Sequence, residues 1–299
     1  MPVFHPIDVD EAVDLLARRG PRRILAGGTD EMVRINHGAA VRDGEEIVCL
    51  NNITELRSWA FESDRRVLVI GAAVPWTELA SGAIATLCPC LAEAARTVGS
   101  PQIRNAGTLG GNVATASPAG DGLCAAVALD AVAVIRSAAG SRRVPVAELV
   151  TGPKQTGLGP EELITSFEIP LTEGYQGYAK VGVRNAMVIS IAGACLVVDE
   201  QHGTSRLALG SVGPTILRCP EAEPLITDVI LNRSGNTARL DEIVDSVRSA
   251  ARPIDDHRAT ADYRRHAVGV LARRLVTRAI SAREENNTSP AAKTTVSSN

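Results

Sequence analysis

The stretch ILAGGTDEMVRIN, residues 24–36, runs a short apolar segment directly into Gly-Gly-Thr-Asp and then into a segment of helical character. Two adjacent glycines add conformational freedom that folding must remove. A turn that only reverses the chain can be made without them. The pair therefore indicates either a tight turn that stabilises the fold or a place where bare backbone N–H groups approach an anion.

Helical and strand-like segments alternate on both sides of this turn. Asp8 precedes a helix with a capping-box-like start. Short apolar runs predict strands at residues 22–26, 45–50, 65–74, 131–137 and 162–170. Helical patterns lie at residues 75–79, 89–99 and 122–130. The stretch 100–122 is long, small and polar, and no helix or strand is predicted there. The interleaving predicts an α/β or α+β fold.

The pattern of the sequence changes near residues 172–177, from alternating helices and strands to a run of strands followed by helices. Strand-like runs at 177–184, 187–200 and 206–212 predict a smaller sheet, and helical patterns follow at 219–230, 238–251 and 262–281. We therefore expect a first domain at residues 1–172 and a small α+β domain at residues 173–282. The polar residues 283–299 are predicted to form a disordered tail.

Composition excludes several classes of protein. The chain has 299 residues, 45% hydrophobic and 22% charged, which is enough for a sizeable core and two domains. A net charge of −3 and 3% aromatic residues give no support for nucleic-acid binding. No segment predicts a membrane span, and the N-terminus lacks the pattern of a secretory signal. A cytoplasmic location is expected.

No familiar metal or nucleotide motif is present. The cysteines at positions 49, 88, 90, 124, 195 and 219 form no C-x-x-C pair, so we expect buried reduced thiols rather than a zinc or iron–sulfur site. The five histidines show no ligand spacing, and no metal site is predicted. The P-loop pattern, a G-x-G-x-x-G after a strand and the G-x-S-x-G elbow are all missing.

Two glycine-rich turns are candidate anion-binding sites. They are Ala26-Gly27-Gly28-Thr29 and Gly107-Thr108-Leu109-Gly110-Gly111-Asn112. Amides at such turns or at a helix start can cradle an anion, and the Thr29 or Thr108 hydroxyl adds a donor. Two cradles in one domain could hold a pyrophosphate between them. Taken singly, each turn is equally compatible with a structural role.

The loop Ser117-Pro118-Ala119-Gly120-Asp121 follows the second turn closely. Asp121 could cap the helix that begins after it. Alternatively, the Asp121 carboxylate or the Ser117 hydroxyl could accept a hydrogen bond from a ligand. The spacing alone leaves both open.

Four stretches together resemble a known family. They are AGGTD at 26–30, QIRNAGTLGGNVATASPAGD at 102–121, ELITSFEIP at 162–170 and DYRRHAVGVLARRL at 262–275. In this order they resemble the FAD-binding medium subunit of molybdenum hydroxylases, the carbon monoxide dehydrogenase and xanthine dehydrogenase family, up to about residue 280. The resemblance implies an FAD-binding domain of two α/β subdomains, of the PCMH/vanillyl-alcohol-oxidase-like type, followed by a small α+β C-terminal domain.

The resemblance also implies a set of cofactor-binding residues and no catalytic acid or base. The FAD diphosphate would be lined by Ala26, Gly27, Gly28, Thr29 and Asp30 together with Thr108, Gly110, Gly111 and Asn112. Thr115 and Asp121 would make polar contacts further along FAD, and Ile164 would lie near the flavin ring. Lys180 falls on a family position that is often basic and close to the flavin, where its charge would favour reduced, anionic flavin. The alternative is a solvated strand residue.

The sequence departs from the family pattern after the first turn. Family members often show an apolar pair and a lysine there, whereas this chain has Glu31. The Glu31 carboxylate would lie near the predicted diphosphate or point to solvent. The cysteine-rich insertion of members that carry their own cluster is missing, so the flavin would receive its electrons from a partner.

The function implied by the resemblance is electron transfer. A molybdopterin-binding large subunit would oxidise the substrate, a small subunit would relay electrons through two [2Fe–2S] clusters, and FAD in this chain would pass them to NAD+ or another acceptor. The family analogy suggests a heterohexamer. Two alternatives are a docking or assembly subunit with little redox turnover and a free-standing flavin oxidoreductase.

Overall fold

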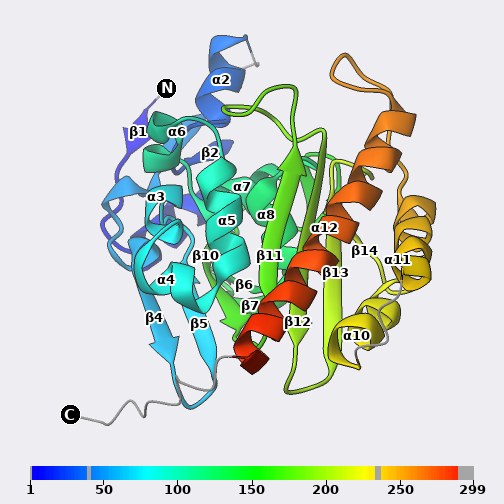
Figure 1. The fold of residues 1–299 in the computed structure, drawn as a ribbon. Coiled ribbons are helices and arrows are strands. Elements are labelled where there is room, and N and C mark those ends of the chain that lie inside the picture. Colours follow the sequence, from blue (N-terminus) through cyan, green and yellow to red (C-terminus); the bar gives the residue numbers. More distant parts are fainter. Residues whose placement is uncertain (1, 39–41, 233–236, 289–299) are drawn as a thin grey trace.

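The computed structural model describes residues 2–38, 42–232 and 237–288 (Figure 1). Its first layer is a parallel sheet of order β1-β3-β2, made of β1 (Val3–Phe4), β2 (Arg22–Leu25) and β3 (Glu46–Cys49). Helix α1 (Val9–Ala17) packs on it, and α2 (Glu31–Asn36) follows the first glycine turn. Two short 3-10 helices, η1 (Leu50–Asn52) and η2 (Glu55–Arg57), lead out of this subdomain.

The predicted capping box at the start of α1 is confirmed. The Asp8 carboxylate accepts a hydrogen bond from the Glu11 N–H at 2.8 Å. In return, the Glu11 carboxylate accepts one from the Ile7 N–H at 2.9 Å. Two N–H groups at the helix start are thereby satisfied, which fixes where α1 begins.

The second subdomain is built on an antiparallel sheet of order β4-β5-β10-β6-β7. Its strands are β4 (Trp59–Glu62), β5 (Val67–Gly71), β6 (Val132–Ser137), β7 (Gly140–Pro145) and β10 (Leu163–Pro170). The helices of this part are α3 (Trp76–Leu79), α4 (Gly82–Leu87), α5 (Pro89–Thr97), α8 (Asp121–Ala128) and α9 (Val146–Leu149). A small hairpin joins β8 (Val150–Gly152) to β9 (Gln155–Thr156).

Two helices occupy the stretch in which the sequence predicted no element. They are α6 (Pro101–Ala106) and α7 (Leu109–Thr115). The Ser100 hydroxyl accepts a hydrogen bond from the Ile103 N–H at 3.3 Å, and the Thr108 hydroxyl accepts one from the Gly111 N–H at 3.0 Å. Each helix is short and is set by its N-cap, so apolar periodicity could not reveal it.

The C-terminal sheet lies between two layers of helices (Figure 1). Its strands, in spatial order, are β11 (Gln176–Val181), β12 (Ala192–Asp199), β13 (Thr204–Gly210) and β14 (Leu217–Arg218). One face packs on α10 (Glu223–Leu231), α11 (Thr237–Ala250) and α12 (Ala261–Thr288), and the other on α5 and α8. Neighbouring residues of a strand point to opposite faces. Leu196 therefore packs in the core with α10, α11 and α12, whereas Cys195 packs in the core with α5 and α8. This explains why β12 is buried along its whole length.

The end of the chain differs from the prediction. Helix α12 continues to Thr288, so residues 283–288, which the sequence assigned to a disordered tail, are helical. The rest of that predicted tail, residues 289–299, lies outside the described residues. The prediction for the cysteines is confirmed, because all six are buried free thiols.

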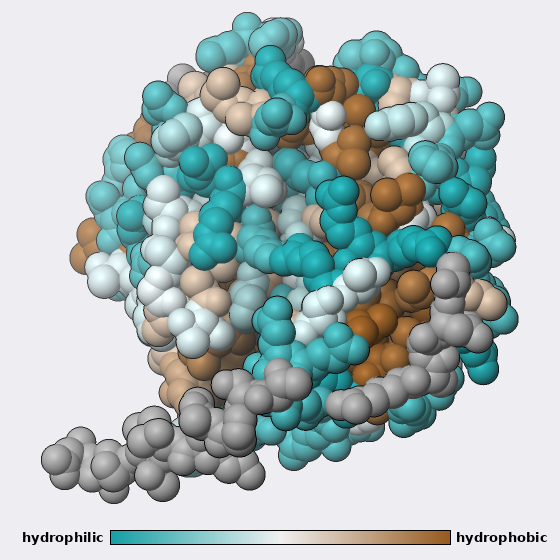
Figure 2. All heavy atoms as spheres, in the orientation of Figure 1, coloured by the Kyte–Doolittle hydropathy of each residue, from teal (hydrophilic) through white to brown (hydrophobic). Residues whose placement is uncertain are grey.

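The mixed α+β class predicted from the sequence is confirmed by this arrangement. On the face shown in Figure 2 most side chains are hydrophilic, and the hydrophobic ones lie chiefly over the C-terminal sheet and its helices. Within the part of the chain that the structure describes, we find no helix with the length and apolar character needed to cross a membrane.

Candidate functional site

A large pocket lies where the N-terminal subdomains meet the C-terminal sheet. Its volume is about 1260 Å³, above the range of roughly 300–1,000 Å³ that is usual for small-molecule sites. The pocket can therefore hold a long ligand with two distinct ends. All of the predicted site residues except Lys180 line it: Ala26, Gly27, Gly28, Thr29, Asp30, Thr108, Gly110, Gly111, Asn112, Thr115, Asp121 and Ile164.

The first glycine turn packs tightly in the fold and also lines the pocket. A Cβ on Gly27 would lie 1.8 Å from the carbonyl oxygen of Ala106, so only glycine allows the turn to pack against the end of α6. Gly28 has a φ of +68°, a conformation that favours glycine. The N–H groups of residues 27–30 have no hydrogen-bond partner among the described residues. These amides are available to an anion in the pocket.

The second glycine turn is used differently. The Gly110 N–H donates to the Ala72 carbonyl at 2.9 Å, and the Gly111 N–H donates to the Thr108 hydroxyl at 3.0 Å. A Cβ on Gly110 would lie 2.5 Å from the same Ala72 carbonyl oxygen. The Gly110 amide therefore holds the turn against the residue that follows β5, the Gly111 amide completes the N-cap of α7, and neither is free for a ligand. What this turn offers the pocket is the Thr108 hydroxyl, whose hydrogen has no acceptor within the described ranges.

Ion pairs compensate the Glu31 carboxylate, which the sequence placed near the diphosphate or in solvent. Glu31 pairs with Arg23 and, at 2.9 Å, with Arg34. Arg23 also binds the buried Glu45 carboxylate at 2.9 Å, and this hydrogen bond is the main reason why the pKa of Arg23 is raised. The Glu31 side chain is only 21% exposed, so the solvent alternative is wrong. These ion pairs connect α2 to β2 and to Glu45, the residue before β3.

Replacing Glu31 with glutamine is expected to weaken FAD binding about threefold to tenfold. The neutral amide loosens the bonds to Arg23 and Arg34, and the N-terminus of α2 then holds the first glycine turn less firmly. A fluorescence titration of the apoprotein with FAD measures the effect, with the exposed Glu221→Gln variant as control. Tighter binding in Glu31→Gln would show instead that the carboxylate repels the ligand.

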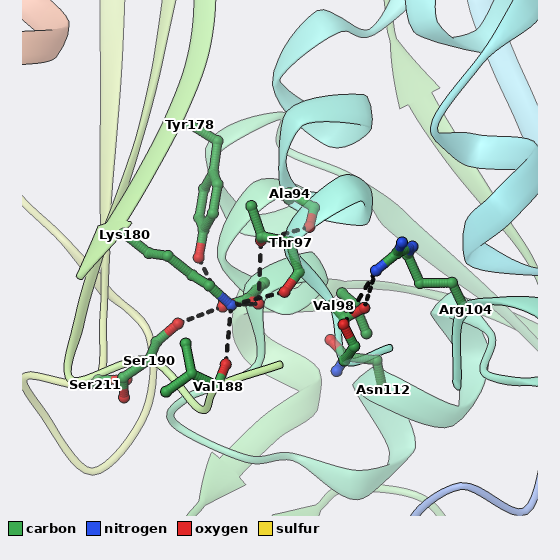
Figure 3. A network of polar contacts seen from close by, with 12 residues as sticks. Ala94, Thr97, Val98, Arg104, Asn112, Tyr178, Lys180, Val188, Ser190 and Ser211 are labelled. Carbon is green, nitrogen blue, oxygen red and sulfur yellow. Dashed lines mark hydrogen bonds and ion pairs between the residues drawn. The ribbon is translucent and has the colours of Figure 1, made fainter. Parts of the chain in front are cut away.

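A buried cluster of polar side chains surrounds Asp121 in the pocket wall. One carboxylate oxygen, Oδ1, accepts hydrogen bonds from the Tyr178 hydroxyl at 2.7 Å and from the Ser190 hydroxyl at 2.5 Å. The other, Oδ2, binds the Lys180 ammonium at 2.6 Å. Figure 3 shows these side chains converging from β11 and the β11–β12 loop. The predicted capping role is wrong, because Asp121 is the first residue of α8, after the N-cap Gly120, and makes no capping bond.

Lys180 is buried behind Asp121 and does not form part of the pocket wall. Its side chain is 9% exposed, so the solvated alternative is wrong. The three ammonium hydrogens go to Asp121, to the Thr97 carbonyl at 2.9 Å and to the Val188 carbonyl at 3.2 Å. The cation thus lies at the C-terminus of α5 and the carboxylate at the N-terminus of α8, where the helix dipoles favour each.

One acceptor site on the pocket-lining Asp121 remains unfilled. The Thr97 hydroxyl lies 3.3 Å from Asp121 Oδ2 but 2.8 Å from the Ala94 carbonyl oxygen. A hydroxyl has a single hydrogen, and the shorter contact takes it. Oδ2 therefore carries only the bond from Lys180 and can accept another from a ligand N–H or O–H. The alternative ligand group, Ser117, lines the pocket and accepts the Ala119 N–H at 3.3 Å.

The sequence analysis missed the residues that hold Asp121. Tyr178 lies two positions before Lys180 on a predicted strand, and the period of two places both on the same face. That signal could have identified it. Ser190 and the pocket-lining Arg258 come from distant parts of the C-terminal domain, and nothing in the local sequence ties them to this site.

Comparisons with known proteins agree with this geometry. Residues 1–172 match the family model described as the FAD binding domain in molybdopterin dehydrogenase, and residues 178–279 match the CO dehydrogenase flavoprotein C-terminal domain. The chain is 31% identical over 279 residues to the xanthine dehydrogenase FAD-binding subunit of Escherichia coli O157:H7, covering 91% of this chain and 93% of that protein.

Two further relatives come from Hydrogenophaga pseudoflava. The carbon monoxide dehydrogenase medium chain is 29% identical, with 91% of this chain and 95% of the relative covered. The solved structure of carbon monoxide dehydrogenase from the same organism superposes with a TM-score of 0.84 at 30% identity, covering 94% of this chain and 97% of that chain. The chain therefore belongs to the FAD-binding subunits of the xanthine dehydrogenase and carbon monoxide dehydrogenase family of oxidoreductases, with FAD as its cofactor.

Proposed function

We propose that this chain is the electron-transfer subunit of a multi-subunit molybdenum hydroxylase. It would receive electrons from [2Fe–2S] clusters in a small partner subunit and deliver them to NAD+ or another acceptor. FAD, when bound, supplies the conversion between one-electron and two-electron transfer, while the protein binds and orients it. We further propose a molybdopterin-binding large subunit as a second partner, a heterohexameric assembly and a cytoplasmic location.

The run of unbonded amides in the first glycine turn is the observation that carries this proposal. The N–H groups of Gly27, Gly28, Thr29 and Asp30 line a pocket large enough for a dinucleotide, and the Thr108 hydroxyl is available in the same pocket. Together they would bind the FAD diphosphate. Gly110 and Gly111 would act by allowing close approach, because their own amides are already bonded.

The rest of the pocket would hold the two ends of FAD. Ala26 and Asn112 would line the diphosphate, and the Asn112 side chain also fixes α8 by accepting the Leu123 N–H at 2.9 Å. Thr115 and Asp121 would make polar contacts toward the flavin. Ile164, next to an irregularity in the pairing of β10 with β6, would lie against the ring. We also propose the division into residues 1–172 and 173–282 as functional domains.

An FAD titration of the full-length apoprotein tests the proposal. We expect the wild-type chain to bind one equivalent of FAD, and Gly28→Asp to raise the Kd at least 100-fold, equivalent to about 2.7 kcal/mol. The new carboxylate would lie beside the phosphates and repel them. Gly203→Asp is the matched control, because Gly203 has a φ of +64°, open space around it and a place in the β12–β13 turn.

The same variant separates electron transfer from a purely structural role. If the complex assembled on co-expression with its partners is active with wild-type chain and inactive with Gly28→Asp, the flavin carries the electrons. A complex that stays fully active with the flavin-free variant would contradict the proposal and favour an assembly subunit.

A further inference from the structure

The C-terminal domain supplies two donors that fix the pocket-lining Asp121 carboxylate. Asp121 belongs to the N-terminal part of the chain, but both hydrogen bonds to its Oδ1 come from the other side, from Tyr178 on β11 and Ser190 on the β11–β12 loop. Tyr178 and Ser190 are 4% and 2% exposed. Neither lines the pocket, and both contact the pocket-lining Asp121 by hydrogen bonds.

The local structure leaves little freedom at either donor. Gly193 faces Tyr178, and a Cβ there would lie 3.1 Å from the tyrosine hydroxyl, so the missing side chain makes room for that group. The Glu93 carboxylate accepts the Tyr178 N–H at 2.6 Å. Burial raises the pKa of Tyr178 well above its usual value, and the charge of Asp121 adds to this effect. The phenol therefore stays a proton donor toward Asp121.

Ser190 is held by a second row of contacts that reaches helix α12. The Ser211 hydroxyl donates to the Ser190 carbonyl at 2.8 Å, and the Ser211 N–H donates to the Pro118 carbonyl, three residues before Asp121, at 2.7 Å. The Arg264 guanidinium, 3% exposed, donates to the carbonyl oxygens of Ile191 at 2.7 Å and of Ser211 at 3.2 Å. Figure 3 shows Ser211 next to Ser190 at the edge of this network.

We propose that Tyr178 and Ser190 are positioning residues that hold the Asp121 carboxylate in one orientation, which leaves an acceptor site of Oδ2 for the ligand, and thereby tune the reduction potential and affinity of the bound flavin. This inference rests on the proposed function. Oδ1 has both acceptor sites filled and Oδ2 has one left, so the two hydroxyls determine which oxygen meets the ligand. If the flavin ring binds next to Asp121, the carboxylate would oppose negative charge on the ring, and Lys180, which does not line the pocket, would act on it only through Asp121.

The test uses the full-length chain with Tyr178→Phe, Ser190→Ala and the double variant. Each single change should raise the Kd for FAD about tenfold, as expected for loss of a hydrogen bond to a charged group. The midpoint potential of bound FAD should shift in the positive direction, because the loosened carboxylate opposes reduction less. A tenfold change in the ratio of affinities for reduced and oxidised FAD corresponds to about 30 mV for a two-electron couple.

Two controls separate positioning from a general loss of structure. Tyr175→Phe also removes a buried tyrosine hydroxyl three positions away, one without a hydrogen-bond partner in the described chain, and should leave the potential and Kd unchanged. Ser190→Thr keeps the hydroxyl and should restore the wild-type potential that Ser190→Ala loses. If Tyr178→Phe fails to fold, the comparison of Ser190→Ala with Ser190→Thr tests the positioning role by itself.

The outcomes for this inference and for the proposed function are distinct. Failure of the wild-type chain to bind FAD would overturn the proposed function. Wild-type FAD binding combined with an unchanged potential in Ser190→Ala would overturn only the positioning role of these hydroxyls. A shift that Ser190→Thr does not reverse would also contradict it, since the hydroxyl would then not be the cause.

Discussion

Replacing Gly27 with alanine is expected to lower the free energy of unfolding by about 3 kcal/mol and to weaken FAD binding at least 100-fold. The added methyl group would lie 1.8 Å from the Ala106 carbonyl oxygen and 2.9 Å from the Cα of Gly107. Both neighbours are backbone atoms, so no side-chain rotation can relieve the overlap. Overpacking of this kind costs roughly 1–3 kcal/mol and occasionally more.

The effect on the ligand follows from where the overlap occurs. The first glycine turn and the end of α6 must separate to accept the methyl group, and this separation displaces the unbonded amides of the turn. Urea unfolding of the apoprotein and an FAD titration measure the two effects. Gly157→Ala is the matched control, because a Cβ on Gly157 meets only the Leu149 carbonyl oxygen, at an ordinary 3.8 Å. Wild-type affinity in Gly27→Ala would show that the turn does not contact the cofactor.

The second large effect is expected at the buried ion pair. Lys180→Met should destabilise the apoprotein by about 3 kcal/mol, because removing one partner of a buried pair leaves an uncompensated charge. The side chains of Lys180 and Asp121 are 9% and 8% exposed, so water can compensate little of it. The double variant Lys180→Met with Asp121→Asn should recover more than half of the unfolding free energy lost in Lys180→Met, since neither buried charge of the pair then remains.

Urea unfolding near neutral pH measures both variants. Lys154→Met serves as control: this lysine is 54% exposed and lies 3.4 Å from Asp30, a surface pair for which about 0–1 kcal/mol is typical. If Lys180→Met and Lys154→Met lowered the free energy of unfolding by the same small amount, the buried position of Lys180 would be contradicted. A double variant less stable than the single one would mean that the Asp121 charge is stabilised by groups other than Lys180.

The pairing also changes what Lys180 contributes to the flavin. The family resemblance suggested a positive charge acting directly on the ring. In the structure all three ammonium hydrogens are bound and the nearest carboxylate neutralises the charge. Asp121 lines the pocket, whereas Lys180 does not line it and binds the Asp121 carboxylate. A lysine and its partner 59 residues away cannot be paired by reading one chain.

Local signals in the sequence were sufficient for most of the longer helices and strands and for the pocket wall, but not for the short helices α6 and α7. The capping box of α1, the apolar runs of the strands and the two glycine turns depend on neighbouring residues, and these are the features that sequence reasoning recovers. The glycine turns were found because glycine is rare where no conformational or steric need exists. The structural interpretation is confirmed for Gly27, which packs against α6, and the anion-binding interpretation stays a prediction that the pocket-lining position of the same turn supports.

Only the tertiary structure decided how these parts act together. The amides of Gly110 and Gly111 form hydrogen bonds within the protein. Arg23 and Arg34 form ion pairs with Glu31. Asp121 accepts hydrogen bonds from Tyr178 and Ser190 of the C-terminal domain. Each of these facts depends on contacts between segments far apart in the chain. The sequence determined which residues could bind a dinucleotide, and long-range packing determined which of their hydrogen-bonding groups remain free to do so.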